Sequence, residues 1–353
     1  MTDSATHGQP YPDTINALTS LRFFAAAAVC IFHLHLIADV PHTFFFYKTY
    51  LGVDFFFILS GFILTHAYFR QAQAGTFSAR VFLVNRIARI YPLHLATLII
   101  AFILIRTLRD SGWDIDTGLR SLVTNLLLVQ TWGFYNVRSF NTPSWSISAE
   151  WFAYLVFAEI IVLALRPRPV VVLISALLFY GVAWYLSIKT LGMAFSEFNL
   201  SFGILRIMPE FVLGMGLYLF GRERLLPING WAAIVLCVAS LIALVCLGAP
   251  DPALILVLGL LILMVAERSR QHSPGILDRR IPLYLGEVSY AVYMVHFLVL
   301  FGVWSFRGNA HYSGLVMLCL PMILLFAILL HHAIEVPCRR AIRNLVSGAE
   351  PSR

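Results

Sequence analysis

Ionisable residues inside long apolar segments are the part of this sequence whose residue types can do chemistry. Arg22 and His33 are eleven positions apart in one such segment. At about 100° per helical residue, this spacing places both side chains on the same face of a helix. An ionisable group is costly in hydrocarbon, so it usually faces a cavity or a partner. The imidazole of His33 can therefore act as a general base, although a lone histidine in an apolar helix is more often structural.

Two carboxylates are expected at a depth in the membrane similar to that of His33. Glu150 lies about 10 Å below the outer end of its apolar segment at 1.5 Å per residue, and Asp54 lies one turn inside another. A carboxylate can fix the tautomer of a neighbouring imidazole and so complete a general base. We therefore predict that His33 and Glu150 meet in one outer-half cavity, with Asp54 as a third catalytic candidate. For Asp54 the alternative is a helix-capping role.

A pair of arginines at the inner end of a third apolar segment could bind phosphate. Arg86 and Arg89 are one helical turn apart and share a face. Two guanidinium groups so placed suit phosphate oxygens, which accept paired hydrogen bonds. The alternative is a membrane anchor, in which both side chains extend to lipid phosphates. The spacing alone does not decide between these two interpretations.

Three further ionisable residues lie inside apolar segments. Arg206 and Glu210 are four positions apart, so they can pair with each other on one helix. His296 is another histidine in an apolar segment.

The segments that carry these residues are predicted to be membrane-spanning helices. The chain has 353 residues, of which 59% are hydrophobic and 12% charged, and its mean hydropathy is +0.81. Soluble domains are nearer half apolar and a quarter charged, so a water-soluble enzyme is excluded. The sequence predicts an all-α fold, a polytopic membrane bundle of about ten spans. These lie at roughly 17–38, 50–69, 81–105, 144–165, 169–188, 202–220, 229–248, 252–266, 282–304 and 313–337.

The distribution of arginine predicts the orientation of the bundle. The apolar run 119–131 has 13 residues, fewer than the roughly 20 that a spanning helix needs. If this run does not cross, the arginine-rich connections all fall on one side, as the positive-inside rule requires. We therefore predict a multi-pass membrane protein with both termini cytoplasmic. The expected organisation is a polar segment 1–16, a transmembrane domain 17–343 and a tail 344–353.

The charge distribution and the spacing of the cysteines argue against nucleic acid, a bound metal and disulfide bonds. The net charge is +7, from 25 Lys and Arg against 18 Asp and Glu. No Lys/Arg run of the nucleic-acid-binding type occurs, so we expect the lipid bilayer and no nucleic acid as a partner. The five cysteines show neither Cys-x-x-Cys nor Cys/His metal spacing, and we expect neither a metal nor a disulfide.

Taken in order, these motifs resemble the membrane-bound acyltransferase family 3, of the polysaccharide O-acetyltransferase type. The resemblance covers about residues 15–343. The matching blocks are Arg22-x10-His33, Gly52–Phe62, Arg86–Pro92, Trp145–Glu150, Arg206–Gly214, Ser289–His296 and Glu335-Val336-Pro337. Each block is weak alone, and their common order is specific. The last motif departs from the family, with Val336 and Cys338 where Arg and an aromatic residue are frequent.

The resemblance implies an enzyme that moves an acyl group, expected to be acetyl, from acyl-CoA on the cytoplasmic side to a carbohydrate hydroxyl. Acyl-CoA is then a co-substrate, and no metal is needed. By the resemblance, His33 is the catalytic base, with Glu150 as its partner. Arg86 and Arg89 contact the coenzyme A phosphates, and Arg22 supports the donor or the pore.

Two alternatives stay open at this stage. Within the same enzyme class, the acceptor can be a macrolide or another secondary metabolite instead of a cell-surface or exopolysaccharide precursor. From another class, a secondary transporter or exporter shares the helical bundle and the buried charges. The missing repeat symmetry between the two halves and the phosphate-suited arginine pair argue against a transporter.

Overall fold

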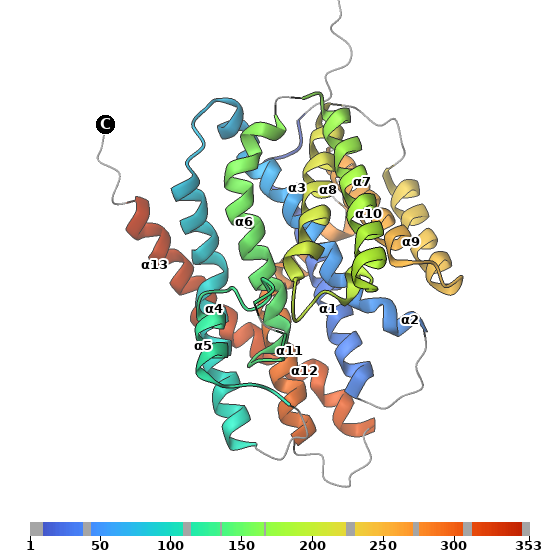
Figure 1. Ribbon diagram of the computed structural model, residues 1–353. Coiled ribbons are helices and arrows are strands. Elements are labelled where there is room, and N and C mark those ends of the chain that lie inside the picture. The colour runs from blue at the N-terminus through green and yellow to red at the C-terminus, as the bar shows by residue number, and fades with distance from the viewer. Residues whose placement is uncertain are drawn as a thin grey trace, which may run out of the picture.

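The structure is a computed structural model, and it describes residues 10–37, 44–108, 114–134, 136–165, 167–223, 230–270, 275–305 and 313–347. In these ranges the chain forms a bundle of helices that run mostly along one axis (Figure 1). The β structure found there is an isolated bridge between Asp116 and Ser139. The predicted all-α membrane bundle is confirmed.

Thirteen α-helices of the described residues follow one another along the chain. They are α1 (Asn16–Ile37), α2 (Phe44–Tyr47), α3 (Gly52–Gln73), α4 (Ala79–Thr107), α5 (Leu119–Leu126), α6 (Trp145–Ala164), α7 (Pro169–Leu186), α8 (Gly203–Glu223), α9 (Gly230–Cys246), α10 (Asp251–Arg270), α11 (Arg280–Ser305), α12 (Ser313–Leu330) and α13 (Val336–Ser347). A π-helical turn, η6 (His331–Glu335), joins α12 to α13.

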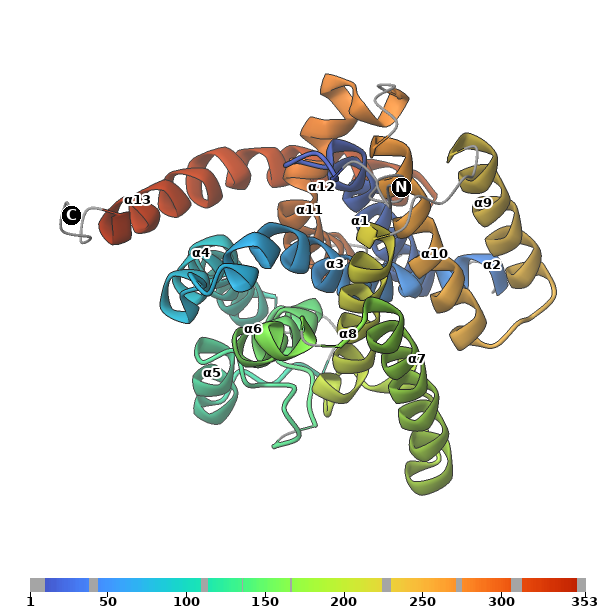
Figure 2. The ribbon, with the colours of Figure 1, turned by 90° about the horizontal axis from the view of Figure 1, so that it is seen from above.

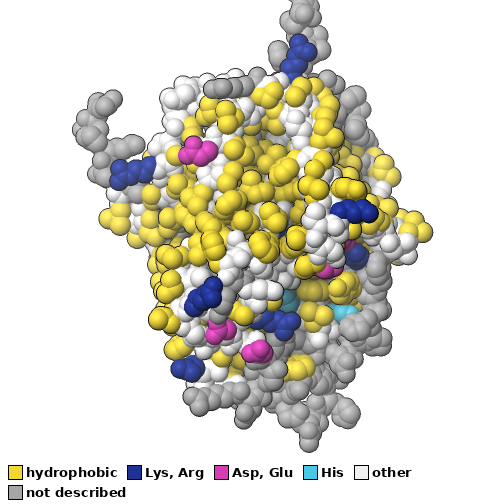
Figure 3. All heavy atoms as spheres, viewed as in Figure 1, with side chains coloured by type: hydrophobic (Ala, Val, Ile, Leu, Met, Phe, Trp, Pro, Cys, Tyr) yellow, Lys and Arg dark blue, Asp and Glu magenta, His cyan; other side chains and the backbone are white. Residues whose placement is uncertain are grey.

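Nine helical segments among the described residues are long and apolar enough to cross a membrane, and they cover nine of the ten predicted spans. Hydrophobic side chains form a broad band over the face shown in Figure 3, with few charged side chains among them. The remaining predicted span, 229–248, coincides with α9, which has 17 residues.

Contacts at the two ends of α10 determine the direction of α9. Gly230, the first residue of α9, lies against Arg268 near the end of α10. The first residue of α10, Asp251, accepts hydrogen bonds from Lys48 and Tyr50, just before α3 begins at the opposite end of the bundle. Helix α9 therefore runs antiparallel to α10 between the two ends. Its length, about 26 Å at 1.5 Å per residue, supports a tenth crossing.

The short apolar run 119–131 behaves as predicted. Helix α5 has eight residues and packs along α4 instead of crossing. The Tyr91 hydroxyl donates to the Leu126 carbonyl at 3.1 Å, and His94 Nε2 lies 2.9 Å from the Asn125 carbonyl. These two contacts from α4 tie α5 to the bundle.

The N-terminal segment is anchored on the end of α10. The Tyr11 hydroxyl donates a hydrogen bond to Glu267, and the Arg270 guanidinium lies 4.0 Å from the centre of the Tyr11 ring. Burial, reinforced by the Glu267 carboxylate, raises the pKa of Tyr11 above its ordinary value. Tyr11 therefore stays a neutral hydrogen-bond donor at physiological pH.

Two helix pairs at the centre of the bundle approach closely at glycines. Helices α1, α3, α8 and α11 lie near the middle when the bundle is seen from above (Figure 2). A Cβ at Gly214 of α8 would overlap the Ile58 carbonyl oxygen of α3, and one at Gly61 would overlap that of Phe211. A Cβ at Gly286 of α11 would meet the Thr19 carbonyl of α1 in the same way. Small residues permit this backbone approach in membrane bundles.

We predict that Gly214→Ala destabilises the protein by about 1–3 kcal/mol or more, because a backbone oxygen cannot move aside as a side chain can. Thermal unfolding in detergent, together with the monodisperse fraction on size-exclusion chromatography, measures the effect. Gly181→Ala in α7 is the matched control, because a Cβ there meets nothing within 4 Å. Equal melting temperatures for the two variants would contradict the close α3–α8 contact.

Candidate active site

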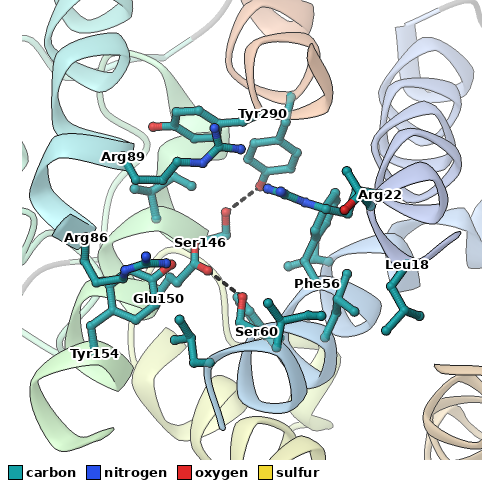
Figure 4. A pocket seen from close by; sticks show the side chains of 18 residues that line it. Leu18, Arg22, Phe56, Ser60, Arg86, Arg89, Ser146, Glu150, Tyr154 and Tyr290 are labelled. Atoms are coloured by element: carbon teal, nitrogen blue, oxygen red, sulfur yellow. Dashed lines mark hydrogen bonds between the residues drawn. The ribbon is translucent and has the colours of Figure 1, made fainter. Parts of the chain in front are cut away.

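A cavity with both charged and apolar walls lies between α1, α3, α4, α6 and α11 and holds about 900 Å³, including its open mouth. Its charged residues are Arg22 from α1, Arg86 and Arg89 from α4, and Glu150 from α6. In Figure 4, the α4 arginines enter from one side and Arg22 from the other, with Glu150 and Ser60 between them. We call this space the central cavity.

The two α4 arginines of the central cavity differ in their contacts. Arg89 forms an ion pair with Glu335 of η6. Arg86 lies over the aromatic rings of Phe82 and Tyr154, 5.8 and 5.9 Å from their centres. The buried Nε of Arg86 has no hydrogen-bond acceptor among the described residues. A buried donor without an acceptor is costly, so Arg86 is suited to an anionic ligand.

The Glu150 carboxylate lies in the same cavity and accepts a hydrogen bond of 2.6 Å from Ser60 Oγ. One turn earlier on α6, Ser146 Oγ lies 2.7 Å from the Tyr293 hydroxyl of α11. Both Ser146 and Tyr293 line the central cavity. Figure 4 shows the two hydrogen bonds as dashed lines.

A second cavity of about 1080 Å³, its mouth included, continues from the first, because Thr19, Arg22 and Arg89 line both. Arg339 and Arg340 of α13 add two positive charges to its wall. We call this second space the vestibule. It also borders η6, and π-helical turns of this kind are frequent at functional sites.

Positive charge is in excess around the two cavities. Their walls hold five arginines together with Glu150 and Glu287, and Glu335 lies directly against Arg89. Glu335 is also 2.9 Å from His331 Nδ1 and 3.8 Å from Arg339. The formal charge of the arginines thus exceeds that of the glutamates by two. Such a lining attracts polyanions.

His33 lies outside the lining of the central cavity. It is partly exposed, and its Nδ1 is 3.0 Å from the Val29 carbonyl oxygen and 3.3 Å from Nε2 of His296. His296 belongs to α11 and is fully buried. The two ring centres are 4.9 Å apart. We call His33 and His296 the histidine pair.

The prediction that His33, Glu150 and Asp54 share one cavity is wrong in its geometry. Only Glu150 lines the central cavity, whereas the observed side-chain partner of His33 is His296. Counting residues from a helix end gives depth, but it does not tell which neighbouring helix a side chain faces. Helix α11 packs against α1 and supplies the partner that α6 was expected to supply.

Asp54 is bound by Arg206 instead. Arg206 Nε donates to Oδ1 at 2.9 Å and its terminal nitrogen to Oδ2 at 2.6 Å, and both side chains are buried. Arg206 also donates to the Ser196 carbonyl at 2.8 Å. The expected pairing of Arg206 with Glu210 on one helix is therefore replaced by a pair across two helices. Asp54 lies in the first turn of α3, but the N-cap residue is Leu51, and the Asp54 carboxylate binds Arg206 instead of capping the helix.

The sequence analysis identified most residues of the site, but it did not identify their side-chain partners. His296 was noted as a histidine in an apolar segment and Glu335 as part of a motif, but neither was assigned to His33 or Arg89. These pairs join positions more than 240 residues apart in the chain. Tyr293 was noticed only as part of a motif.

The fold and the cavities define a polytopic membrane protein with two connected cavities whose charged lining is mainly basic. Residues 15–332 match the acyltransferase domain of acyltransferase family 3, and the chain belongs to this family. It is thus an acyltransferase that transfers groups other than amino-acyl groups.

Three individual relatives are similar to this chain, and one of them is named an acyltransferase. The chain is 31% identical to acyltransferase MdmB of Streptomyces mycarofaciens over 95% of each chain. It is 36% identical to protein 2 in the picA locus of Rhizobium radiobacter, over 32% of this chain and 66% of that protein. An uncharacterised protein of Haemophilus influenzae is 28% identical over 36% of this chain and 57% of its own. No solved structure is significantly similar.

The contacts of Asp54 generate a prediction that separates a structural role from a catalytic one. Asp54→Asn should lower the free energy of unfolding by about 3–5 kcal/mol, because it leaves Arg206 buried without its counter-charge. Thermal and chemical unfolding in detergent measure the loss. Asp13→Asn is the control, because its ion pair with Arg70 is exposed and weak at 3.7 Å. A normally stable Asp54→Asn protein without turnover would instead make Asp54 a catalytic residue.

Proposed function

We propose that this protein transfers an acetyl group from acetyl-CoA to a hydroxyl of a carbohydrate, a precursor of a cell-surface or exported polysaccharide. The observation that carries the proposal is the arginine-lined central cavity and its continuation into the basic vestibule. The proposed setting is a bacterial inner membrane.

The two connected cavities match the two parts of an acyl-CoA. The nucleotide part carries phosphates, and the vestibule offers Arg339 and Arg340, with Arg22 and Arg89 at its junction with the central cavity. The pantetheine arm is narrow and mostly uncharged. The central cavity suits it, because apolar side chains line much of its wall, namely Val53, Phe56, Phe57, Leu59, Ile63 and Leu64. Arg86, with its unpartnered Nε, can bind a phosphate or the thioester carbonyl.

The direction of entry follows from the charge distribution. The vestibule lies near the start of α11 and includes Tyr284, four residues after Arg280. This end of the bundle also carries Arg268 and Arg270, where α10 finishes. Under the positive-inside rule this end is cytoplasmic, which is where acyl-CoA occurs. Both termini are then cytoplasmic as well.

We assign His33 as the general base. It lies near the opposite end of α1, four residues before Ile37, so a hydroxyl can approach it from the outer side. Tyr293 lines the central cavity and contacts His296, its ring centre lying 5.6 Å from that of His296. The end of the central cavity is therefore next to the histidine pair.

The proposed reaction is a direct transfer. The acceptor hydroxyl gives its proton to His33 while its oxygen forms a bond to the acyl carbon. The carbon–sulfur bond then breaks, and the leaving thiolate takes the proton back from His33. The products are the ester and free coenzyme A, and His33 returns to its starting state. Neither a metal nor an oxidant enters this scheme.

We predict that Arg86→Ala weakens the binding of acetyl-CoA about ten- to a hundredfold, because a charge-assisted hydrogen bond is lost. Arg86→Lys should restore only part of the affinity, because it lacks the planar guanidinium. Equilibrium binding of radiolabelled acetyl-CoA to the purified protein is the measurement. Arg106→Ala, at the exposed far end of α4, is the matched control. Unchanged affinity in Arg86→Ala would leave this arginine a membrane anchor.

The second prediction concerns turnover. His33→Ala should reduce acceptor-dependent release of coenzyme A by about 10²–10⁴-fold, because a positioned base is lost, while acetyl-CoA binding stays normal. His35→Ala is the control, since His35 packs near Phe46 and not in the histidine pair. Hexoses, oligosaccharides and glycosylated macrolides are offered as acceptors, so the assay also tests the acceptor class. Normal turnover of His33→Ala with every acceptor would refute the assignment.

A further inference from the structure

The hydrogen bonds of the histidine pair determine the tautomer of both rings. A backbone carbonyl only accepts, so the contact of His33 Nδ1 with the Val29 carbonyl at 3.0 Å requires a proton on Nδ1. For the same reason, His296 carries a proton on Nδ1, which donates to the Tyr293 carbonyl at 2.5 Å. In the neutral His296 ring, Nε2 then holds a lone pair.

The hydrogen bond between the two rings can therefore run in one direction only, from His33 to His296. His33 Nδ1–H is shared between the Val29 carbonyl and His296 Nε2, which lies 3.3 Å away. The lone pair of His33 is then on Nε2, the nitrogen that none of these contacts uses. A general base needs this arrangement, with one nitrogen held by a partner and the other open to the reacting hydroxyl.

We propose that His296 is a positioning residue, which holds His33 in the tautomer that accepts a proton at Nε2. The inference rests on the proposed role of His33 as the base. His296 neither gains nor loses a proton in the reaction. Its Nε2 accepts the Nδ1–H of His33 throughout, and this hydrogen bond becomes stronger while His33 carries the transferred proton, because a charged donor makes a stronger hydrogen bond.

The surroundings of the pair favour a neutral partner. Aromatic rings border it, with Phe32 5.1 Å and Phe297 6.1 Å from the His33 ring centre. Among the residues that the structure describes, no carboxylate hydrogen-bonds to either ring. A fixed negative charge is costly at membrane depth, whereas a second neutral imidazole orients the base without that cost. This accounts for the base being held by His296 and not by Glu150.

Two substitutions of His296 separate positioning from packing. His296→Leu fills a similar volume but removes the acceptor, whereas His296→Gln can place its side-chain carbonyl near the position of Nε2. His94→Leu is the matched control, because His94 is also buried and bonds a backbone carbonyl, but lies on α4 beside α5. Each purified variant is assayed with acetyl-CoA and the acceptor that the wild-type protein uses best, and its thermal unfolding is recorded.

We expect His296→Leu to lower kcat about 10- to 100-fold with an unchanged KM for acetyl-CoA, which corresponds to one lost hydrogen bond to a charged group. His296→Gln should recover most of this loss, and His94→Leu should retain normal kcat. Normal kcat in His296→Leu, with His33→Ala inactive, would overturn this inference and leave the proposed function standing. Equal losses in the Leu and Gln variants, with lowered melting temperatures, would make His296 a packing residue. Turnover that survives His33→Ala would overturn the proposed function itself.

Discussion

Charge buried at membrane depth must be neutralised or must face a cavity, and this constraint organises the whole bundle. Arg206 meets it by binding both oxygens of Asp54, which fixes α8 against α3. Arg89 meets it through Glu335, which fixes α4 against the π-helical turn η6. An unpaired ion in hydrocarbon costs several kcal/mol, so each pair holds its helices in one register. Arg86 differs from these two arginines, because its buried Nε has no acceptor among the described residues. An anionic ligand in the central cavity would lower the free-energy cost of burying this charge.

The same constraint explains why the site is rigid on one side. Helix α3 supplies Ser60 and a row of apolar side chains to the cavity wall. Its position is set by the Asp54–Arg206 pair at one level and by the glycine contacts of Gly61 and Gly214 at another. Contacts at two levels prevent α3 from both sliding and rotating against α8. On the other side, η6 interrupts the regular hydrogen bonding between α12 and α13, so the wall that carries Glu335 depends more on its ion pairs.

Hydropathy and arginine placement are local properties, and for that reason the sequence predicts the helical fold and the short α5 well. The face of a helix is also local, and Arg22 and His33 both turn toward α11, as their spacing predicts. The choice of neighbour is different, because it depends on which helices pack together. Glu150 lines the central cavity, yet α11 and not α6 supplies the side chain that meets His33. Likewise, Arg206 had an available partner at Glu210 on its own helix but binds Asp54 across the α3–α8 contact. Only the close approach at the glycines brings that carboxylate within reach.

Helix α11 links the central cavity to the histidine pair through its own geometry. Tyr290, Tyr293 and His296 follow one another at three-residue steps, and each step turns the side chain by about −60° around the helix. Tyr290 accordingly lines the central cavity beside Arg89, and Tyr293 lines it while bonding Ser146. His296 has turned away from the cavity and toward α1, where it meets His33. Helix α11 thus leads from Arg89 to His33, the proposed base, and Tyr293 is the side chain that stands between them. In the proposed reaction, an acyl group bound in the central cavity therefore passes this tyrosine to reach a hydroxyl at His33. The Ser146–Tyr293 hydrogen bond then lies on the proposed path between donor and acceptor.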